Sequence, residues 1–247
     1  MKIRADLLLV ARGLVESRAK ARAAIEAGGV TVGGIVVGKP SELLADDALI
    51  EAVPAHPWVG RGALKLIHAL DLWPVVVEGR VVLDVGASTG GFSQVCLSRG
   101  AARVYAVDVG HGQLHPKVAS DSRVISLEGT DARDLTMALV PEPPSLIVVD
   151  VSFISLAKAI PAALCLAEPG ADLVALVKPQ FEVGRGNVGK GGIVSDDRAH
   201  LDALEAVKAF LTKVGWIVQA TTDSPIEGGD GNHEYLLWAR LPQSTTA

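Results

Sequence analysis

The chain has 247 residues, of which 49% are hydrophobic, 21% charged and only 4% aromatic. This composition suits a globular protein whose core is built from aliphatic side chains. The net charge is −5 and no run of 18 uncharged apolar residues occurs, so we expect neither a membrane span nor a uniformly basic protein.

The two cysteines, Cys96 and Cys165, fall in segments that read as helix and belong to no CxxC motif. We interpret both as buried residues of a protein in a reducing compartment. The first residues lack the pattern of a secretory signal peptide, since charges interrupt every apolar run there. We therefore expect a cytoplasmic protein.

The first part of the chain differs in charge from the remainder. Residues 1–40 contain seven Lys or Arg and three Asp or Glu, so the negative charge lies in the rest of the chain. Two short helices are predicted within residues 3–28, the second capped by Ser17 and closed near Gly28. Short strands are predicted at 30–32, 35–37 and 48–53, and a proline-containing linker follows.

Beyond the linker, buried strands alternate with helices. A helix is predicted over 61–72, and strands at 81–85, 103–108, 124–127, 146–150 and 173–178. This alternation predicts an α/β fold with a parallel sheet covered on both faces. The last two strands, 215–222 and 234–241, have no helix between them and indicate an antiparallel pair.

The segment 84–92 follows a strand, opens a helix and is rich in glycine. Gly86, Gly90 and Gly91 allow a ligand to approach the backbone closely, and the helix start offers free amide groups. Because Ser88 replaces the second glycine of GxGxxG, the spacing is poor for a dinucleotide and typical of an adenosylmethionine loop. The predicted cofactor-binding residues are Asp84, Gly86, Ser88, Thr89, Gly90, Gly91, Phe92, Asp108 for the ribose and Asp131 for the adenine amino group.

Two acids and two lysines are candidate catalytic residues. Asp150 ends the fourth strand and Lys178 the fifth, so both should lie at one edge of the sheet, while Lys65 and Glu234 lie on the helix before the sheet and on its last strand. Lysine is seldom buried without a partner, and two independent salt bridges are the alternative interpretation. Methyl transfer to a hydroxyl group needs a base, and a lysine becomes one when its surroundings lower its pKa.

The chain resembles the TlyA family, whose members are known as hemolysins and as rRNA (cytidine-2′-O)-methyltransferases. The resemblance covers residues 3–241, and the segments that carry it are 58–65, 83–92, 104–114, 150–156 and 177–186. It implies an FtsJ-like (RrmJ-like) methyltransferase domain that uses S-adenosylmethionine, with Lys65, Asp150, Lys178 and Glu234 as a Lys-Asp-Lys-Glu tetrad. The fold to expect is a class I Rossmann-like methyltransferase, a seven-stranded, mostly parallel sheet of order 3-2-1-4-5-7-6.

The resemblance also implies a small N-terminal α+β S4 domain that binds RNA. We expect an S4 domain over residues 1–53, a linker over 54–60 and the methyltransferase domain over 61–247. The expected partners are ribosomal RNA or ribosomal subunits, methylated at a cytidine of 16S or 23S rRNA. Candidate RNA-binding residues are basic: Arg4, Arg18, Lys20, Arg22, Arg61, Arg185 and Lys190.

Other functions have weaker support. Residues 184–191 nearly fit GxxxxGK[ST] but end in Gly191, so the hydroxyl that would bind magnesium is missing. His111 and His115 are four apart, but the glycines and proline around them disfavour a helix, and we expect no metal. A non-enzymatic cytolysin or RNA-binding protein, and an NAD-dependent oxidoreductase, stay as alternatives.

Overall fold

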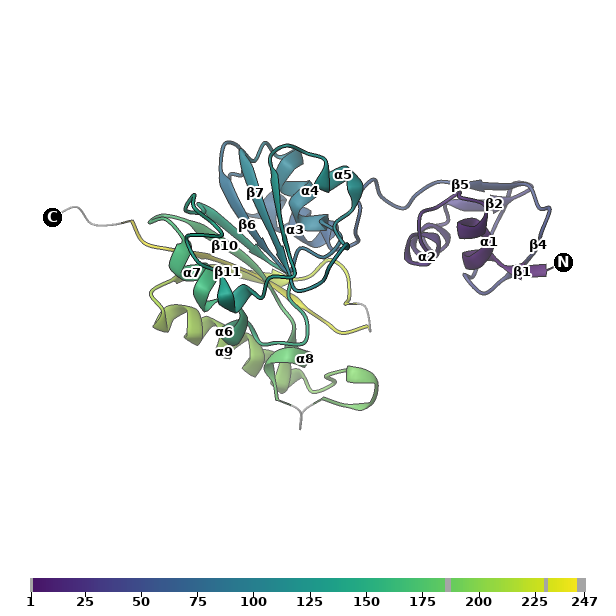
Figure 1. Cartoon of the computed structure of the whole chain (residues 1–247). Helices are drawn as coiled ribbons and strands as arrows, with labels where there is room; N and C mark the ends of the chain where they lie inside the picture. Colours follow the sequence, from purple (N-terminus) through teal and green to yellow (C-terminus); the bar gives the residue numbers. More distant parts are fainter. Residues whose placement is uncertain (1, 185–187, 229–230, 244–247) are drawn as a thin grey trace. The chain divides into compact units, whose positions relative to one another are not determined.

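The computed structural model describes residues 2–184, 188–228 and 231–243 (Figure 1). Contacts within the chain divide it into two compact units, Met1–Pro57 and Trp58–Ala247. Within the described residues, no helix is both long and apolar enough to cross a membrane.

The N-terminal unit packs two helices against short strands. Its elements are β1 (Lys2–Arg4), α1 (Ala5–Ala11), α2 (Arg18–Glu26), β2 (Val30–Val32), β3 (Ile35–Val36), β4 (Leu43–Ala45) and β5 (Ile50–Ala52). β1 pairs with β4, and β2 lies between β3 and β5, all antiparallel. As predicted, Ser17 caps α2, its side chain accepting a hydrogen bond from Lys20 N. A small core of Leu8, Leu9, Ile25 and Val30 holds the unit together.

The second unit is built around one seven-stranded sheet. Its strands are β6 (Val81–Val85), β7 (Arg103–Asp108), β8 (Val124–Glu128), β9 (Leu146–Val149), β10 (Asp172–Val177), β11 (Ile217–Asp223) and β12 (Tyr235–Arg240). They lie in the order β11-β12-β10-β9-β6-β7-β8, with β12 antiparallel to both of its neighbours and the others parallel. Numbered from β6, this is the predicted order 3-2-1-4-5-7-6.

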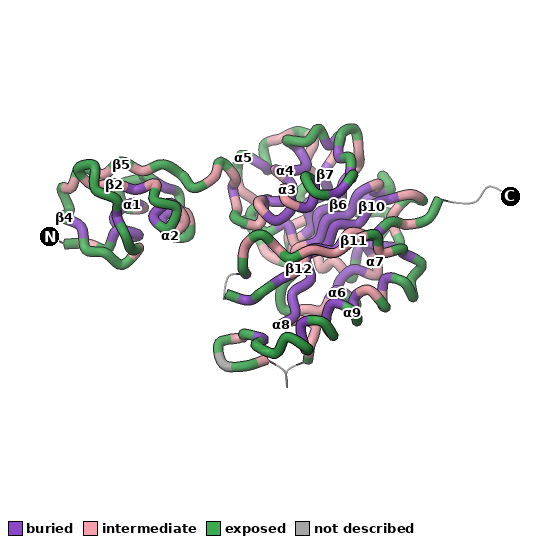
Figure 2. The backbone as a smooth tube through the Cα atoms, turned by 180° about the vertical axis from the view of Figure 1, so that it is seen from behind, coloured by how far each residue is buried: buried purple, intermediate pink, exposed green. Residues whose placement is uncertain are grey.

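Helices cover both faces of this sheet. The helical elements are α3 (Ala63–Leu72), α4 (Gly91–Ser98), α5 (Pro116–Ala119), η1 (Ala132–Asp134), α6 (Leu156–Ala159), α7 (Pro161–Leu166), α8 (Pro179–Glu182), η3 (Lys190–Gly192) and α9 (Asp197–Lys213). Successive strand residues enter different cores: Val82 packs with α3 and α4, whereas Leu83 packs with α6, α7 and α9. The buried strands therefore lie between two helical layers (Figure 2).

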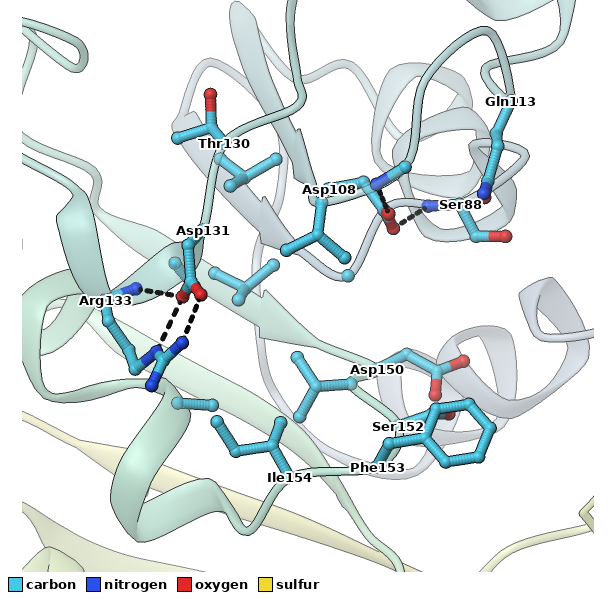
Figure 3. Close-up of a pocket in the computed structure, with 18 residues that line it drawn as sticks. Ser88, Asp108, Gln113, Thr130, Asp131, Arg133, Asp150, Ser152, Phe153 and Ile154 are labelled. Carbon is cyan, nitrogen blue, oxygen red and sulfur yellow. Dashed lines mark hydrogen bonds and ion pairs between the residues drawn. The ribbon is translucent and has the colours of Figure 1, made fainter.

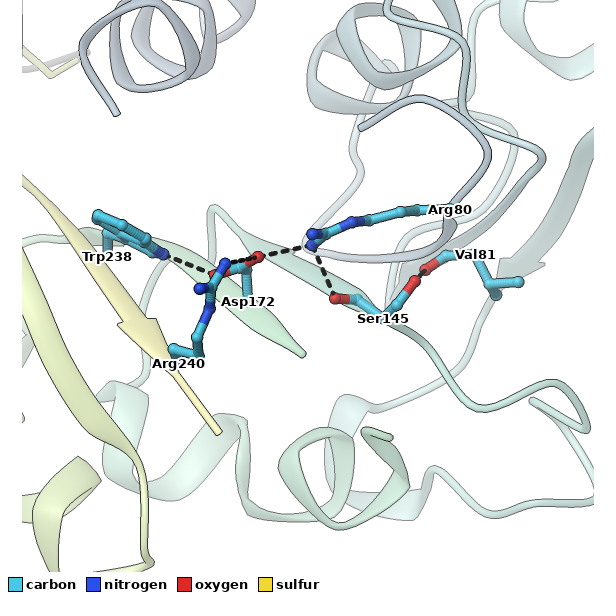
Figure 4. A network of polar contacts seen from close by, with 6 residues as sticks. All are labelled: Arg80, Val81, Ser145, Asp172, Trp238 and Arg240. Atoms are coloured by element: carbon cyan, nitrogen blue, oxygen red, sulfur yellow. Dashed lines mark hydrogen bonds and ion pairs between the residues drawn. The ribbon is translucent and has the colours of Figure 1, made fainter. Parts of the chain in front are cut away.

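One buried carboxylate joins segments at the edge of the sheet where β10 begins. Asp172 accepts hydrogen bonds from Arg80 Nη1 at 2.6 Å, Trp238 Nε1 at 2.8 Å and Arg240 Nε at 2.9 Å (Figure 4). Burial opposes ionisation of Asp172, but the hydrogen bonds from Arg240, Trp238 and Arg80 outweigh it and hold its pKa below the ordinary value. The network thus connects β10, β12 and the turn before β6.

The prediction for the cysteines is half right. Cys96, on α4, is buried in the core, and burial raises its pKa well above the ordinary value. Cys165 is exposed, because its position on α7 turns away from the sheet-facing residues Ala163 and Leu164.

Candidate active site

The loop between β6 and α4 is curled so tightly that glycine is required at its bends. Gly86 has φ +86°, and a Cβ on it would lie 2.5 Å from the backbone oxygen of Asp150. Gly90 has φ +90° and caps α4 in the left-handed conformation. The ends of β6 and β9 therefore approach each other more closely than any larger residue would permit.

A cavity of about 640 Å³ opens at the carboxyl ends of the strands beside this loop (Figure 3). Asp108, at the end of β7, lies in its wall and accepts hydrogen bonds from Ser88 N at 2.8 Å and Gly110 N at 2.7 Å. Apolar residues line the cavity beside these polar groups: Val107, Val109, Ala132, Ile154 and Ala159. The cavity thus combines an apolar slot with a carboxylate held by two loops.

Asp131 also lines this cavity, but its carboxylate already has a partner. Arg133 binds both of its oxygens, with Nη2 to Oδ2 at 2.6 Å and Nε to Oδ1 at 3.0 Å. These hydrogen bonds lower the pKa of Asp131 to about 2. Any ligand that bonds to Asp131 must share it with Arg133.

Asp84 lies behind the loop, outside the residues that line the cavity. It is fully buried, and its Oδ2 accepts a hydrogen bond from Ser93 Oγ at 2.6 Å. Burial, together with the nearby charges of Asp150 and Asp108, raises its pKa to about 7 although the hydrogen bond from Ser93 lowers it. In its observed position Asp84 supports the start of α4 from below.

A second cavity of about 280 Å³ adjoins the first. Both are lined by Gly86, Ser88, Asp150 and Ser152, and the second also by Thr89, Gly91, Phe92, Arg61 and Lys178. The two cavities therefore meet at Asp150 and Ser152, which follow β9.

The four candidate catalytic side chains meet as two ion pairs in the part of the chain that the structure describes. Lys178 Nζ lies 2.6 Å from Asp150 Oδ1 and donates a hydrogen bond to Ser152 Oγ at 2.9 Å. Lys65 Nζ lies 2.5 Å from Glu234 Oε2. Both lysines are buried, so each ammonium group needs its carboxylate.

Two glycines bring these pairs to their positions. Gly62 precedes α3, the helix that carries Lys65, and a Cβ there would lie 3.2 Å from Asp150 Oδ2. A Cβ on Gly228 would lie 2.5 Å from Glu234 Oε1. The start of α3 thus lies against the carboxylate that pairs with Lys178.

Phe153 is a site residue that the sequence reasoning missed. It lines the larger cavity and is 91% exposed. Its backbone is in the left-handed conformation, with φ +67°. Its ring lies 5.2 Å from that of Phe181. One signal was present in the sequence, because each phenylalanine comes three residues after a strand-end candidate, Asp150 or Lys178.

The predicted RNA-binding residues are distributed over both units. Arg4 and Arg18 bind Asp6, Lys20 pairs with Glu16, and Arg22 lies 3.9 Å from Glu26. Arg61 lines the smaller cavity, and Lys190 begins η3. Arg185 lies outside the described residues.

Comparisons with known proteins give matches over nearly the whole chain. The model of FtsJ-like methyltransferases matches residues 58–241, and that of the S4 domain matches residues 3–50. The 16S/23S rRNA (cytidine-2′-O)-methyltransferase TlyA of Mycobacterium tuberculosis is 45% identical over 97% of this chain and 90% of its own. Hemolysin A of Brachyspira hyodysenteriae is 41% identical over 95% of this chain and 98% of its own. A solved structure of a candidate hemolysin from Streptococcus thermophilus is 40% identical in sequence. The match covers 99% of this chain and 91% of that one, with a TM-score of 0.77.

Proposed function

The chain belongs to the TlyA family of FtsJ-like methyltransferases with an N-terminal S4 domain, and we propose that it methylates a ribose 2′-hydroxyl of ribosomal RNA. The proposed target is a cytidine of 16S rRNA, 23S rRNA or both, and the proposed compartment is the cytoplasm. The observation that carries this proposal is the ion pair between the buried Lys178 and Asp150 at the meeting point of the two cavities.

The larger cavity fits S-adenosylmethionine. Its glycine-lined edge accepts a ligand where a Cβ would clash, Asp108 offers a carboxylate to ribose hydroxyls, and the apolar slot suits an adenine ring. When bound, the cofactor would supply an electrophilic methyl group on its sulfonium centre. The smaller cavity is then the proposed entry for the target ribose.

We assign Lys178 the role of general base. A ribose hydroxyl is a weak nucleophile, so a group within hydrogen-bond distance must accept its proton as the new bond forms. Asp150 and Ser152 orient Lys178 Nζ from two sides, and the proposed base is the neutral amine that forms once the ammonium group has released one proton to solvent. The buried Lys65–Glu234 pair completes the proposed tetrad.

The experiment is methyl transfer from tritiated S-adenosylmethionine to purified small subunits, large subunits and a synthetic duplex. We expect label in ribosomal RNA at a linkage that resists alkaline cleavage, because alkaline cleavage needs a free 2′-hydroxyl. Lys178→Ala should keep cofactor affinity and lose at least about 100-fold in rate. Lys208→Ala, on the exposed face of α9, is the matched control and should match the unmodified protein.

Each failure has a separate meaning. Cofactor binding without label in any RNA would move the substrate to another class of molecule. Retained transfer in Lys178→Ala would overturn the assignment of the base. Absence of cofactor binding, together with lysis of lipid vesicles, would favour the cytolysin instead.

A further inference from the structure

We propose that Asp6 is a positioning residue that holds Arg4 and Arg18 together as a preorganised phosphate-binding pair. The inference rests on the proposed RNA-binding function of the N-terminal unit. Asp6 lies in the first turn of α1 and is fully buried. It accepts hydrogen bonds from Arg4 Nε, Arg4 Nη2 and Arg18 Nη2, each at 3.0 Å.

The arrangement leaves positive charge and free donors at the surface. Two guanidinium groups share one carboxylate, so the cluster has a net charge of about +1. The side chain of Arg4 is 44% exposed and that of Arg18 59%, whereas Asp6 is 0% exposed. Most of the arginine N–H groups therefore remain available to a phosphate, while water cannot reach the carboxylate that orients them.

Asp6 also stays ionised throughout the useful pH range. The hydrogen bonds from Arg4 hold its pKa well below the ordinary value, those from Arg18 add to the effect, and burial only partly opposes them. The orienting charge is therefore permanent.

The cluster connects two elements that are separate in the sequence. Arg4 ends β1 and Arg18 begins α2, while Asp6 lies on α1, which packs against α2. One carboxylate thus sets the spacing between two cations that the chain alone would leave free to move apart.

The other basic side chains of this unit are held differently. Lys20 pairs with Glu16, which lies just before α2, and Arg22 with Glu26 one turn further along α2, both at the surface. Exposed pairs of this kind contribute little and open readily. Lys20 and Arg22 therefore supply charge, whereas the Asp6 cluster supplies charge at a fixed place.

The test is the affinity of the full chain for ribosomal RNA, measured by fluorescence anisotropy over a series of salt concentrations. Asp6→Asn removes a negative charge, so charge alone predicts tighter binding. Positioning predicts the opposite: an affinity lower by about 10-fold, the effect of losing roughly one charge-assisted hydrogen bond. Glu26→Gln, which removes one exposed negative charge from the same unit, is the matched control and should bind as tightly as the unmodified protein or slightly better.

Salt dependence separates positioning from charge. Arg4→Ala and Arg18→Ala should each lower the slope of log affinity against log salt by about 1, whereas Asp6→Asn should leave that slope unchanged. An unchanged or higher affinity in a folded Asp6→Asn protein would overturn the inference.

A second variant decides the matter if Asp6→Asn does not fold. The double change Arg4→Lys with Arg18→Lys keeps both charges and the carboxylate but removes the planar donors. Weaker RNA binding by this variant would support the role of positioned guanidinium groups. Undiminished binding would overturn the inference. If the unmodified chain bound no ribosomal RNA, the proposed function itself would fall.

Discussion

Phe153 combines two features that folded proteins usually avoid. A large aromatic side chain that is 91% exposed gains little from burial, and a left-handed backbone costs a residue with a Cβ about 1–2 kcal/mol. Backbone strain of this kind is commonly found in active sites and ligand-binding sites, where the surrounding structure maintains it. The ring lies at the edge of the larger cavity beside Phe181, where an unstacked base could lie against it.

We therefore predict that replacing Phe153 separates activity from stability. Phe153→Gly relieves the backbone strain, so its melting temperature should equal or exceed that of the unmodified protein. Its kcat/KM for RNA should nevertheless fall about 10- to 100-fold, because base stacking on an aromatic ring contributes roughly 1–3 kcal/mol. Phe153→Trp should retain most of the activity, and cofactor affinity should be unchanged in both.

Leu201→Ala is the control for loss of exposed apolar surface alone, because Leu201 is exposed on α9 and lines neither cavity. It should keep full activity. Full activity of Phe153→Gly would show that the ring does not contact the substrate.

At the scale of elements, the strands of the large sheet could be predicted, and so could the short strands β2, β3 and β5, whereas β1 and β4 could not. The strands of the large sheet are buried on both faces, so they read as apolar runs, and Asp108, Asp150 and Lys178 were recognisable because each lies at the end of such a run. β1 and β4 have only three residues each, which is too short a stretch for an alternating pattern to be recognised, and no glycine turn joins them to a neighbouring strand as Gly33 and Gly34 join β2 to β3. Their pairing depends on contacts between segments about 40 residues apart.

The same limit applies to individual side chains of the site. The glycines of 86–91 could be predicted because a positive φ or a close neighbouring backbone permits only glycine, so the residue type itself reveals the conformation. Asp84 was predicted as a ligand from its position in the motif, yet whether a carboxylate faces a cavity or the core depends on packing by Ser93 and α4. Exposure of Phe153 likewise depends on the conformation of its loop.

The close approach of the β6 and β9 ends gives a prediction at this scale. Gly86→Ala should strain the backbone and also push the Asp150 carbonyl away, so we expect loss of at least about 2 kcal/mol of stability and more than 10-fold weaker cofactor binding. Gly79→Ala has a similar φ, +73°, with nothing within 4 Å of the added Cβ. It should cost only about 1 kcal/mol and leave cofactor affinity intact.

Thermal unfolding and titration calorimetry measure both variants. Equal effects of the two changes on cofactor affinity would rule out a special role for the contact between the strand ends.

Across the whole second unit, two fully buried carboxyl groups have opposite surroundings. Asp172, at the start of β10, has two guanidinium groups and an indole N–H as donors (Figure 4). Asp84, at the other edge of the sheet, has one hydroxyl donor and lies near the charges of Asp108 and Asp150. The pKa of Asp172 is consequently lowered and that of Asp84 raised. Ionisation of Asp172 therefore stabilises the folded state, whereas ionisation of Asp84 destabilises it.

These directions predict how stability depends on pH. The unfolded chain ionises Asp84 near its ordinary pKa of 3.8, whereas the folded chain keeps the proton until about pH 7. Stability from this group should therefore fall as the pH rises from about 4 to 7 and stay low above that range. Asp84→Asn should remove this fall and raise stability at pH 8 by roughly 2–4 kcal/mol.

Asp172 should act in the opposite sense and in a different range. Its folded pKa is below the unfolded value, so its contribution is complete above about pH 4 and is lost as the pH falls further. Asp172→Asn should lower stability at pH 7 by about 2 kcal/mol, because the two arginines lose their shared charge. Thermal unfolding of both variants between pH 3 and 8 measures the contrast. If Asp84→Asn were less stable than the unmodified protein at pH 8, the carboxyl group would have to be compensated by contacts other than Ser93, and its raised pKa would be wrong.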